Sequence, residues 1–236
     1  MKRLAPALAA GVALLLWGYL SRYLPALPIK LDIMLSSAIV LALLGVLVWG
    51  MLPLRSLGRR LPLITVVALP LAILFVWLHL VPLASVAKIV AAGALGIWIA
   101  EELEQLSWIV IVAGVSAAVD IVSVAVGPTK ALLGKGPVVV GYFTVAVTWM
   151  GYSYDEAYTG LGVSDVIFFA LYLGAARRFG LRVGWSAVAM VGSFLATIAA
   201  AMFWTALPAL PLLSVAFLAV NGDLLWRRLR KPASAG

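Results

Sequence analysis

Long apolar runs without a charged residue constrain this chain more than any other feature. Several windows of roughly 20 residues carry no charge, which is enough helix to cross a hydrocarbon core of about 30 Å. The chain of 236 residues is 65% hydrophobic and only 11% charged, whereas a soluble domain is about half apolar and a quarter charged. The sequence therefore predicts an all-α fold, a polytopic transmembrane helical bundle.

About eight spans are expected within a single membrane domain. The first begins like a signal peptide but stays apolar as far as Leu20, so we expect it to remain uncleaved. Residues 1–104 are expected to form scaffold helices, and residues 105–236 to carry the functional residues. The expected spans are 5–22, 32–52, 62–81, 84–100, 107–127, 163–177, 183–204 and 207–226.

The basic residues are divided unequally between the two sides that eight spans define. Twelve of the 17 Lys and Arg residues fall on the side that carries both termini. Because basic residues collect in cytoplasmic loops, both termini of this multi-pass cell-membrane protein are expected in the cytoplasm. The same rule accounts for the net charge of +8, so no nucleic-acid partner is expected.

The connection between the fifth and sixth expected spans, residues 128–162, has an unusual composition. Its core, PVVVGYFTVAVTWMGYSYDE, is rich in β-branched and aromatic residues and lacks a helical stripe. This composition favours a short strand or hairpin. We expect the strand within 138–148, which includes Val139 and Val140. A strand with an open edge can receive another extended segment by backbone pairing.

Asp120 and Asp165 differ from the other acids because each lies where a span is otherwise apolar. Asp120 is about two turns from the end of the fifth expected span, and Asp165 is at the opening of the sixth. The connection between these spans leaves and returns on one face, so both acids can reach a similar depth. Two carboxyls brought together share a proton. One can accept a proton from water while the other donates to a carbonyl oxygen, as in aspartic proteolysis.

The residues alone leave other roles open for these two acids. A single intramembrane aspartate can bond a neighbouring serine or cap a helix, and Asp165 with Ser164 could cap the sixth span. A proton- or ion-coupled transporter would also use such a pair. A non-catalytic membrane chaperone or scaffold is a third class. The chain has no cysteine and one histidine, so no metal site is expected.

Three stretches, in order and relative spacing, resemble motifs of the presenilin and signal peptide peptidase family of GxGD intramembrane aspartyl proteases. AAVDIVSVAVGPTKALLGKGP looks like the first site, with Asp120 in the catalytic position. GLGVSDVIFFALYLGAA looks like the second, with Asp165 as the other catalytic residue and Gly162 as the first motif glycine. ALPALPLLSVAFL holds the family's triplet at the start of the last span, formed by Pro208, Ala209 and Leu210.

The resemblance covers the chain from about His79 onward and includes two departures. Val119 stands where the family has tyrosine, and Ser164 replaces the second motif glycine, so the sequence reads GVSD. Glycine permits close backbone approach and unusual dihedral angles that serine does not share.

The resemblance implies an aspartic endopeptidase that hydrolyses peptide bonds within or near transmembrane segments, using Asp120, Asp165 and water, with no cofactor. Its partners would be transmembrane substrates and the lipid bilayer. The inferred orientation resembles that of signal peptide peptidase, so substrates with a cytoplasmic N-terminus are expected. The residues expected to bind an unwound substrate are Gly162, Val163, Ser164, Pro208, Ala209, Leu210, Val139 and Val140.

Overall fold

The computed structural model describes residues 4–126, 137–153, 158–203 and 207–230. Helices occupy all eight of the expected spans within these residues, which confirms an all-α bundle of membrane type. Six helical stretches of the described chain are long and apolar enough to cross a membrane. One of them, Ile29–Trp77, contains two of the expected spans. The long helices are α1 (Ala5–Leu20), α2 (Ile29–Met51), α3 (Leu61–Trp77), α4 (Val81–Glu102), α5 (Leu106–Val126), α8 (Val163–Arg178), α9 (Val183–Ala201) and α10 (Leu210–Leu229).

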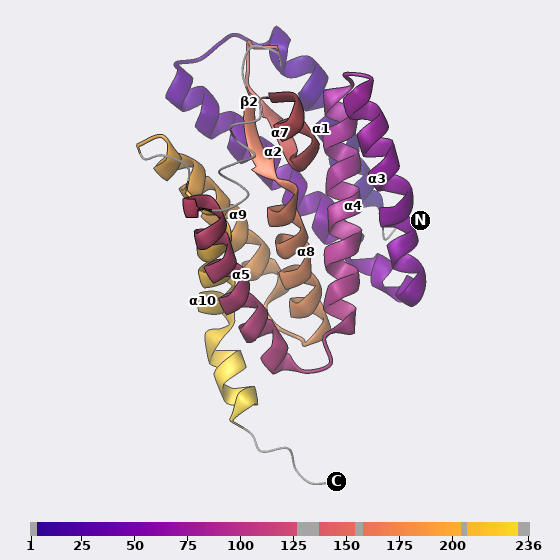
Figure 1. Ribbon diagram of the computed structural model, residues 1–236, viewed down its shortest axis with the longest axis vertical. Helices are drawn as coiled ribbons and strands as arrows, with labels where there is room; N and C mark the ends of the chain where they lie inside the picture. Colours follow the sequence, from indigo (N-terminus) through magenta and orange to yellow (C-terminus); the bar gives the residue numbers. More distant parts are fainter. Residues whose placement is uncertain (1–3, 127–136, 154–157, 204–206, 231–236) are drawn as a thin grey trace.

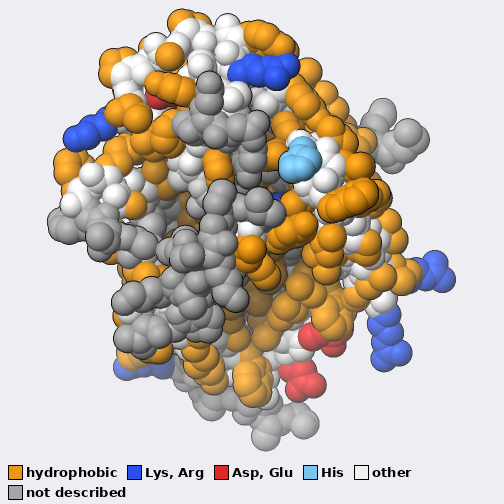
Figure 2. All heavy atoms as spheres, turned by 45° about the horizontal axis from the view of Figure 1, so that its top comes forward, with side chains coloured by type: hydrophobic (Ala, Val, Ile, Leu, Met, Phe, Trp, Pro, Cys, Tyr) orange, Lys and Arg blue, Asp and Glu red, His pale blue; other side chains and the backbone are white. Residues whose placement is uncertain are grey.

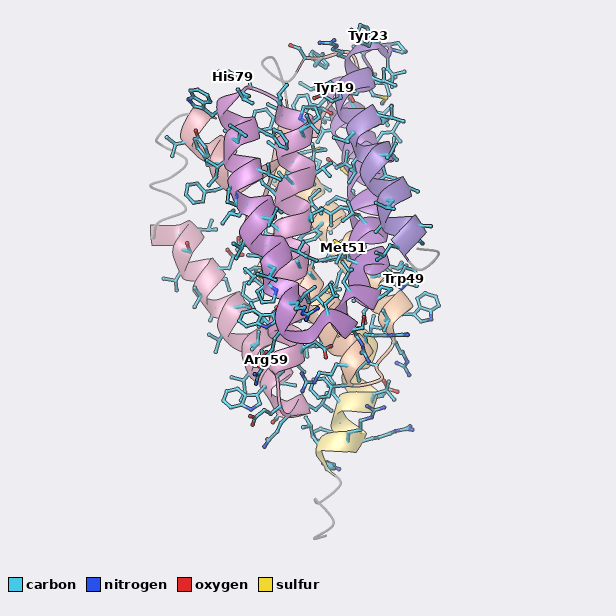
Figure 3. All side chains as sticks on the ribbon, turned by 90° about the vertical axis from the view of Figure 1, so that its right-hand side faces the viewer. Tyr19, Tyr23, Trp49, Met51, Arg59 and His79 are labelled. Atoms are coloured by element: carbon cyan, nitrogen blue, oxygen red, sulfur yellow. The ribbon has the colours of Figure 1, made fainter. Side chains whose placement is uncertain are left out.

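The chain reverses direction between α2 and α3. The connecting η3 (Leu52–Arg60) is a 3₁₀ segment interrupted at Gly58, where φ is 52° and ψ is −123°. Glycine adopts this backbone conformation without the steric cost of a Cβ. Figure 3 shows the consequence, since Arg59, just before α3, lies low in the bundle and His79, just after α3, lies at its top, with Met51 between them in height. Helices α2 and α3 therefore run in opposite directions.

A two-stranded antiparallel sheet lies between α5 and α8 in the chain. β1 (Thr144–Thr148) pairs with β2 (Tyr158–Gly162), with Thr144 opposite Gly162. The expected hairpin is therefore confirmed. The strand expected over 138–148 is wrong in its first half, because α7 (Pro137–Phe143) is helical and contains Val139 and Val140.

The end of α7 shows why this half of the segment is helical. Proline is favoured at the start of a helix, where its missing N–H is not needed. At the other end, Lys88 of α4 donates hydrogen bonds to the carbonyls of Gly141 and Thr144. A cation near a helix C-terminus compensates the unpaired carbonyls there. A contact with a distant helix thus favours this short helix, and local composition does not reveal it.

Helix α8 lies in the middle of the bundle (Figure 1), packed against α4 on one side and contacting α9 and α10, while Tyr172 reaches Ser116 of α5. Its side chains Phe169 and Tyr172 are fully buried. Close contact with α4 depends on glycine, since a Cβ on Gly96 would lie 2.3 Å from the Ile167 carbonyl oxygen. The position of α8 is therefore fixed by backbone contact as well as by side chains.

On the described part of the face in Figure 2, hydrophobic side chains predominate, and charged side chains lie toward its margins. At the end that holds the C-terminus, the loop after α8 is joined to α10. Arg182 forms a bidentate ion pair with Asp223, with both nitrogen–oxygen distances 2.8 Å. Arg228 also donates to the Phe179 carbonyl. These contacts place Arg182 and Arg228 at the same end of the bundle.

Candidate functional site

Asp120 lies on α5 and contacts the first residues of α10. The backbone N–H of Leu210 donates to Asp120 Oδ2 at 3.0 Å, and the N–H of Ala209 also bonds this carboxylate. The first amides of a helix have no partner within the helix, and here a carboxylate from another helix accepts them. The predicted triplet Pro208, Ala209 and Leu210 is thus in contact with the first predicted catalytic residue.

Asp165 is the third residue of α8, directly after β2. Its carboxylate accepts a hydrogen bond from the backbone N–H of Gly162, the residue that caps the helix. This geometry is one half of a capping box, in which an acid reaches back to the cap amide. A Cβ on Gly162 would lie 2.9 Å from Asp165 Oδ2. The missing side chain of Gly162 therefore leaves the space in which the Asp165 carboxylate lies.

The carboxylates of Asp120 and Asp165 are close enough to interact electrostatically. Each side chain is half-buried, so neither is sealed from water within the described part of the chain. Asp120 bonds the start of α10, and Asp165 follows β2 at the start of α8. Two carboxyls that interact in this way can share one proton.

A chain of hydroxyl groups joins the three helices beyond the aspartates. Tyr172 of α8 lies 3.1 Å from Ser116 Oγ of α5 and 2.9 Å from Ser214 Oγ of α10. Its ring stacks on Phe217 with the centroids 4.9 Å apart. Ser116 is one turn before Asp120, and Ser214 is one turn after Leu210. This hydroxyl chain fixes how the helices that carry the site are spaced and rotated.

The remaining predicted residues have different surroundings. Pro208 and Ala209 are not helical, because α10 begins at Leu210, as the two prolines around it predict. Val163 packs partly buried against the core, and Ser164 is exposed. Val119, which stands where the family has tyrosine, is 60% exposed on the outside of α5.

The edge of β1 that faces away from β2 is occupied by side chains of α1 and α4. The Thr144 carbonyl accepts from Lys88 at 2.8 Å, and the Ala146 N–H donates to Ser85 Oγ at 3.1 Å. The Thr148 carbonyl accepts from the Trp17 indole at 3.2 Å. These bonds leave β1 with no free edge. Segment 138–148, which we expected to hold a substrate by strand pairing, therefore has both edges of its strand occupied, by β2 on one side and by α1 and α4 on the other.

The outer edge of β2 is different. In an antiparallel pair, two residues directly opposite each other either exchange both backbone hydrogen bonds or both point their backbone groups outward. Gly160 is opposite Ala146, whose backbone points away from β2. The N–H and C=O of Gly160 therefore point outward, and Gly160 is exposed and has no partner among the described residues. This edge leads directly into Gly162 and Asp165. Among the described residues, β2 is thus the strand next to Asp165 that has a backbone position without a partner, at Gly160.

Sequence reasoning did not identify Tyr172 or the β2 edge. A lone tyrosine in an apolar span gives no pattern that indicates two serine partners on other helices.

The described residues contain no group of three or more His, Cys, Asp or Glu side chains placed to hold a metal ion. Comparison of the chain with protein families, curated proteins and solved structures gives no match.

Proposed function

We propose that this protein is an intramembrane aspartyl protease that hydrolyses peptide bonds of transmembrane substrates. The observation that supports the proposal is that two half-buried carboxylates, Asp120 and Asp165, lie close enough to interact electrostatically, and that Asp120 accepts a hydrogen bond from the start of α10. The sequence resemblance assigns catalytic roles to the same two residues.

The chemistry follows from a shared proton. The ionised carboxyl takes a proton from water as the water oxygen bonds to the scissile carbonyl carbon. The protonated carboxyl donates to the carbonyl oxygen, which gives a tetrahedral intermediate with both charges compensated. When the C–N bond breaks, the carboxyl that took the proton from water donates it to the leaving nitrogen, and the other carboxylate takes a proton from a hydroxyl of the tetrahedral intermediate, so the dyad returns to one shared proton. Each carboxyl acts as a base in one step and as an acid in the other, so the reaction requires both.

The substrate must be extended at the cleaved bond, because a helix hides its carbonyls in its own hydrogen bonds. The β2 edge at Gly160 supports a way to hold it, by adding the substrate as a further strand that leads toward Asp165. Pro208 and Ala209 lie on the other side of the site, through the contact of α10 with Asp120. This assignment replaces Val139 and Val140, which are helical.

The test uses purified full-length protein and a transmembrane peptide with helix-destabilising residues. We expect cleavage by the wild type, loss of at least about a thousandfold in Asp120→Asn and in Asp165→Asn, and inhibition by a hydroxyl-bearing mimic of the tetrahedral intermediate. Glu104→Gln, a change at an exposed acid between α4 and α5, serves as the control. Cleavage that persists in either Asn variant contradicts the proposal.

The same variants separate this proposal from a coupled transporter. A transporter would lose ion-coupled uptake in both Asn variants, show no cleavage in the wild type and have no reason to bind the transition-state mimic. A protease retains neither cleavage nor tight inhibitor binding once the dyad is changed.

A further inference from the structure

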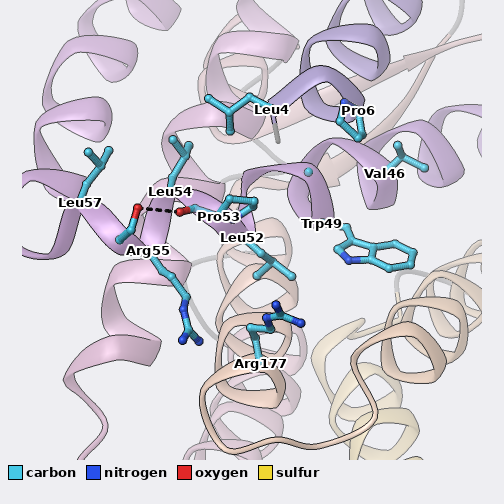
Figure 4. Close-up of a pocket in the computed structure, with 12 residues that line it drawn as sticks. Leu4, Pro6, Val46, Trp49, Leu52, Pro53, Leu54, Arg55, Leu57 and Arg177 are labelled. Atoms are coloured by element: carbon cyan, nitrogen blue, oxygen red, sulfur yellow. Dashed lines mark hydrogen bonds between the residues drawn. The ribbon is translucent and has the colours of Figure 1, made fainter. Parts of the chain in front are cut away.

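A large pocket lies at the arginine-rich end of the bundle. It has a volume of about 1230 Å³ and is bounded by the start of α1, the end of α2, η3 and the last turn of α8 (Figure 4). Arg177, which lines it, is twelve residues after Asp165 on α8, or roughly 18 Å along the helix. The pocket is therefore separate from the proposed catalytic site.

The walls of this pocket are mostly apolar and accessible. In Figure 4, Val46 and Trp49 of α2 lie on one side, and Leu54 and Leu57 of η3 on the other. Trp49 is 51% exposed and Leu57 is 42% exposed. Tryptophan is typical of the boundary between lipid tails and water. A wall of this kind, at the end of a membrane helix, suits an acyl chain better than a water-soluble ligand.

Among the described residues that line the pocket, two guanidinium groups are the only charges. Arg177 is exposed and has no hydrogen bond or ion pair with any described residue. Arg55 has only a distant counter-ion, with its Nη1 4.0 Å from Glu101 Oε1. Such an ion pair is weak near water. Both guanidinium groups thus have donors available for an anion.

We propose that this pocket binds an anionic phospholipid of the adjacent leaflet. The phosphate would lie against Arg55 and Arg177, since guanidinium groups match phosphate oxygens with paired hydrogen bonds. The acyl chains would cover the apolar wall formed by Val46, Trp49 and Leu57. Basic pockets between transmembrane helices bind lipid headgroups in this way. The bound lipid would join α2 and η3 to the end of α8, whose other end carries Asp165.

The test measures lipid retention on purified full-length protein by native mass spectrometry. Phosphatidylglycerol and phosphatidylcholine with identical acyl chains are titrated in detergent. We expect the anionic lipid to bind more tightly, and Arg55→Gln combined with Arg177→Gln to weaken it about 30-fold, for a loss of about 1 kcal/mol at each arginine. Arg59→Gln combined with Arg60→Gln removes the same charge outside the pocket and should change binding less than about twofold.

A further variant and further outcomes test the lipid-binding proposal without depending on how the arginine variants fold. Val46→Trp fills the apolar wall but keeps both arginines, so it should weaken phosphatidylglycerol binding while the thermal midpoint stays near that of the wild type. Equal losses in both arginine pairs would show general surface attraction and overturn the proposal. Equal binding of the two lipids, or displacement of the lipid by millimolar inorganic phosphate, would overturn it as well.

Discussion

Gly162 supports the proposed site through the side chain that it lacks. A Cβ there would press on Asp165 Oδ2 from 2.9 Å, so Gly162→Ala must displace the carboxylate. A displacement of about 1 Å in a catalytic group can lower the rate about a hundredfold. We expect that loss in the rate of peptide cleavage, with a cost in stability of about 1 kcal/mol or less.

The matched control for this change is Gly192→Ala on α9. A Cβ on Gly192 meets no atom within 4 Å, so the control should cleave at the wild-type rate. Unfolding of both variants is followed by circular dichroism. A Gly162→Ala protein as active as the control would mean that the Asp165 carboxylate has room to move without loss of function.

Tyr172 tests whether the hydroxyl chain sets the spacing of the three helices. Tyr172→Phe keeps the stack on Phe217 but removes the hydroxyl that bonds Ser116 and Ser214. We expect a loss of about 1–2 kcal/mol in the free energy of unfolding and a lower kcat for the cleaved peptide. Tyr19→Phe, at a half-exposed tyrosine on α1, should change neither. Unchanged stability in Tyr172→Phe would contradict the structural role of the chain.

Single residues were predictable from sequence only where a motif gave their order. Asp120, Asp165 and Gly162 were predicted in this way; in the structure Gly162 bonds Asp165, and Asp165 interacts electrostatically with Asp120, while their catalytic role stays a prediction. Tyr172 carried no such signal, because its partners lie on α5 and α10, more than forty residues away in either direction. A contact of this range depends on helix packing, which one sequence does not reveal.

At the level of elements, β1 depends on side chains from the scaffold helices. Lys88 is only 6% exposed and bonds two carbonyls at the junction of α7 and β1. Lys88→Met would leave both carbonyls without this partner. Bonds to a charged group contribute about 1.5–3 kcal/mol. We expect backbone amides of β1 to exchange with deuterium about ten- to a hundredfold faster in this variant.

The control for the strand is Lys30→Met, because Lys30 is exposed at the start of α2. It removes the same charge and should leave exchange in β1 unchanged. If the β1 amides exchange as slowly in Lys88→Met as in the wild type, pairing with β2 is enough to hold the strand. The contacts with the scaffold helices are then not needed.

Elements with a strong periodic or apolar signal were predicted well, and short ones were not. The eight long helices follow long apolar runs, and each lies within a few residues of its expected span. The hairpin was predicted from β-branched residues, but the helix Pro137–Phe143 was not. Its residues favour strand locally, and a lysine from α4 completes its end instead.

For the whole molecule, the positive-inside rule predicts that the arginine-rich end faces the cytoplasm. The chain has no cysteine, so single cysteines report on each end without background. Ser56→Cys lies at the arginine-rich end and Tyr23→Cys at the other. On intact cells, a membrane-impermeant maleimide should label Tyr23→Cys, and should label Ser56→Cys only after the membrane is permeabilised. The reverse pattern would invert the orientation.

The most direct measurement of the central claim compares peptide cleavage by Asp120→Asn, Asp165→Asn and the double variant. Residues that act as one unit are strongly non-additive. We predict that each single change lowers kcat/KM as far as both changes together, because one carboxyl without the other can neither share a proton nor activate water. Losses that multiply in the double variant, or substantial cleavage by either single variant, would contradict a dyad.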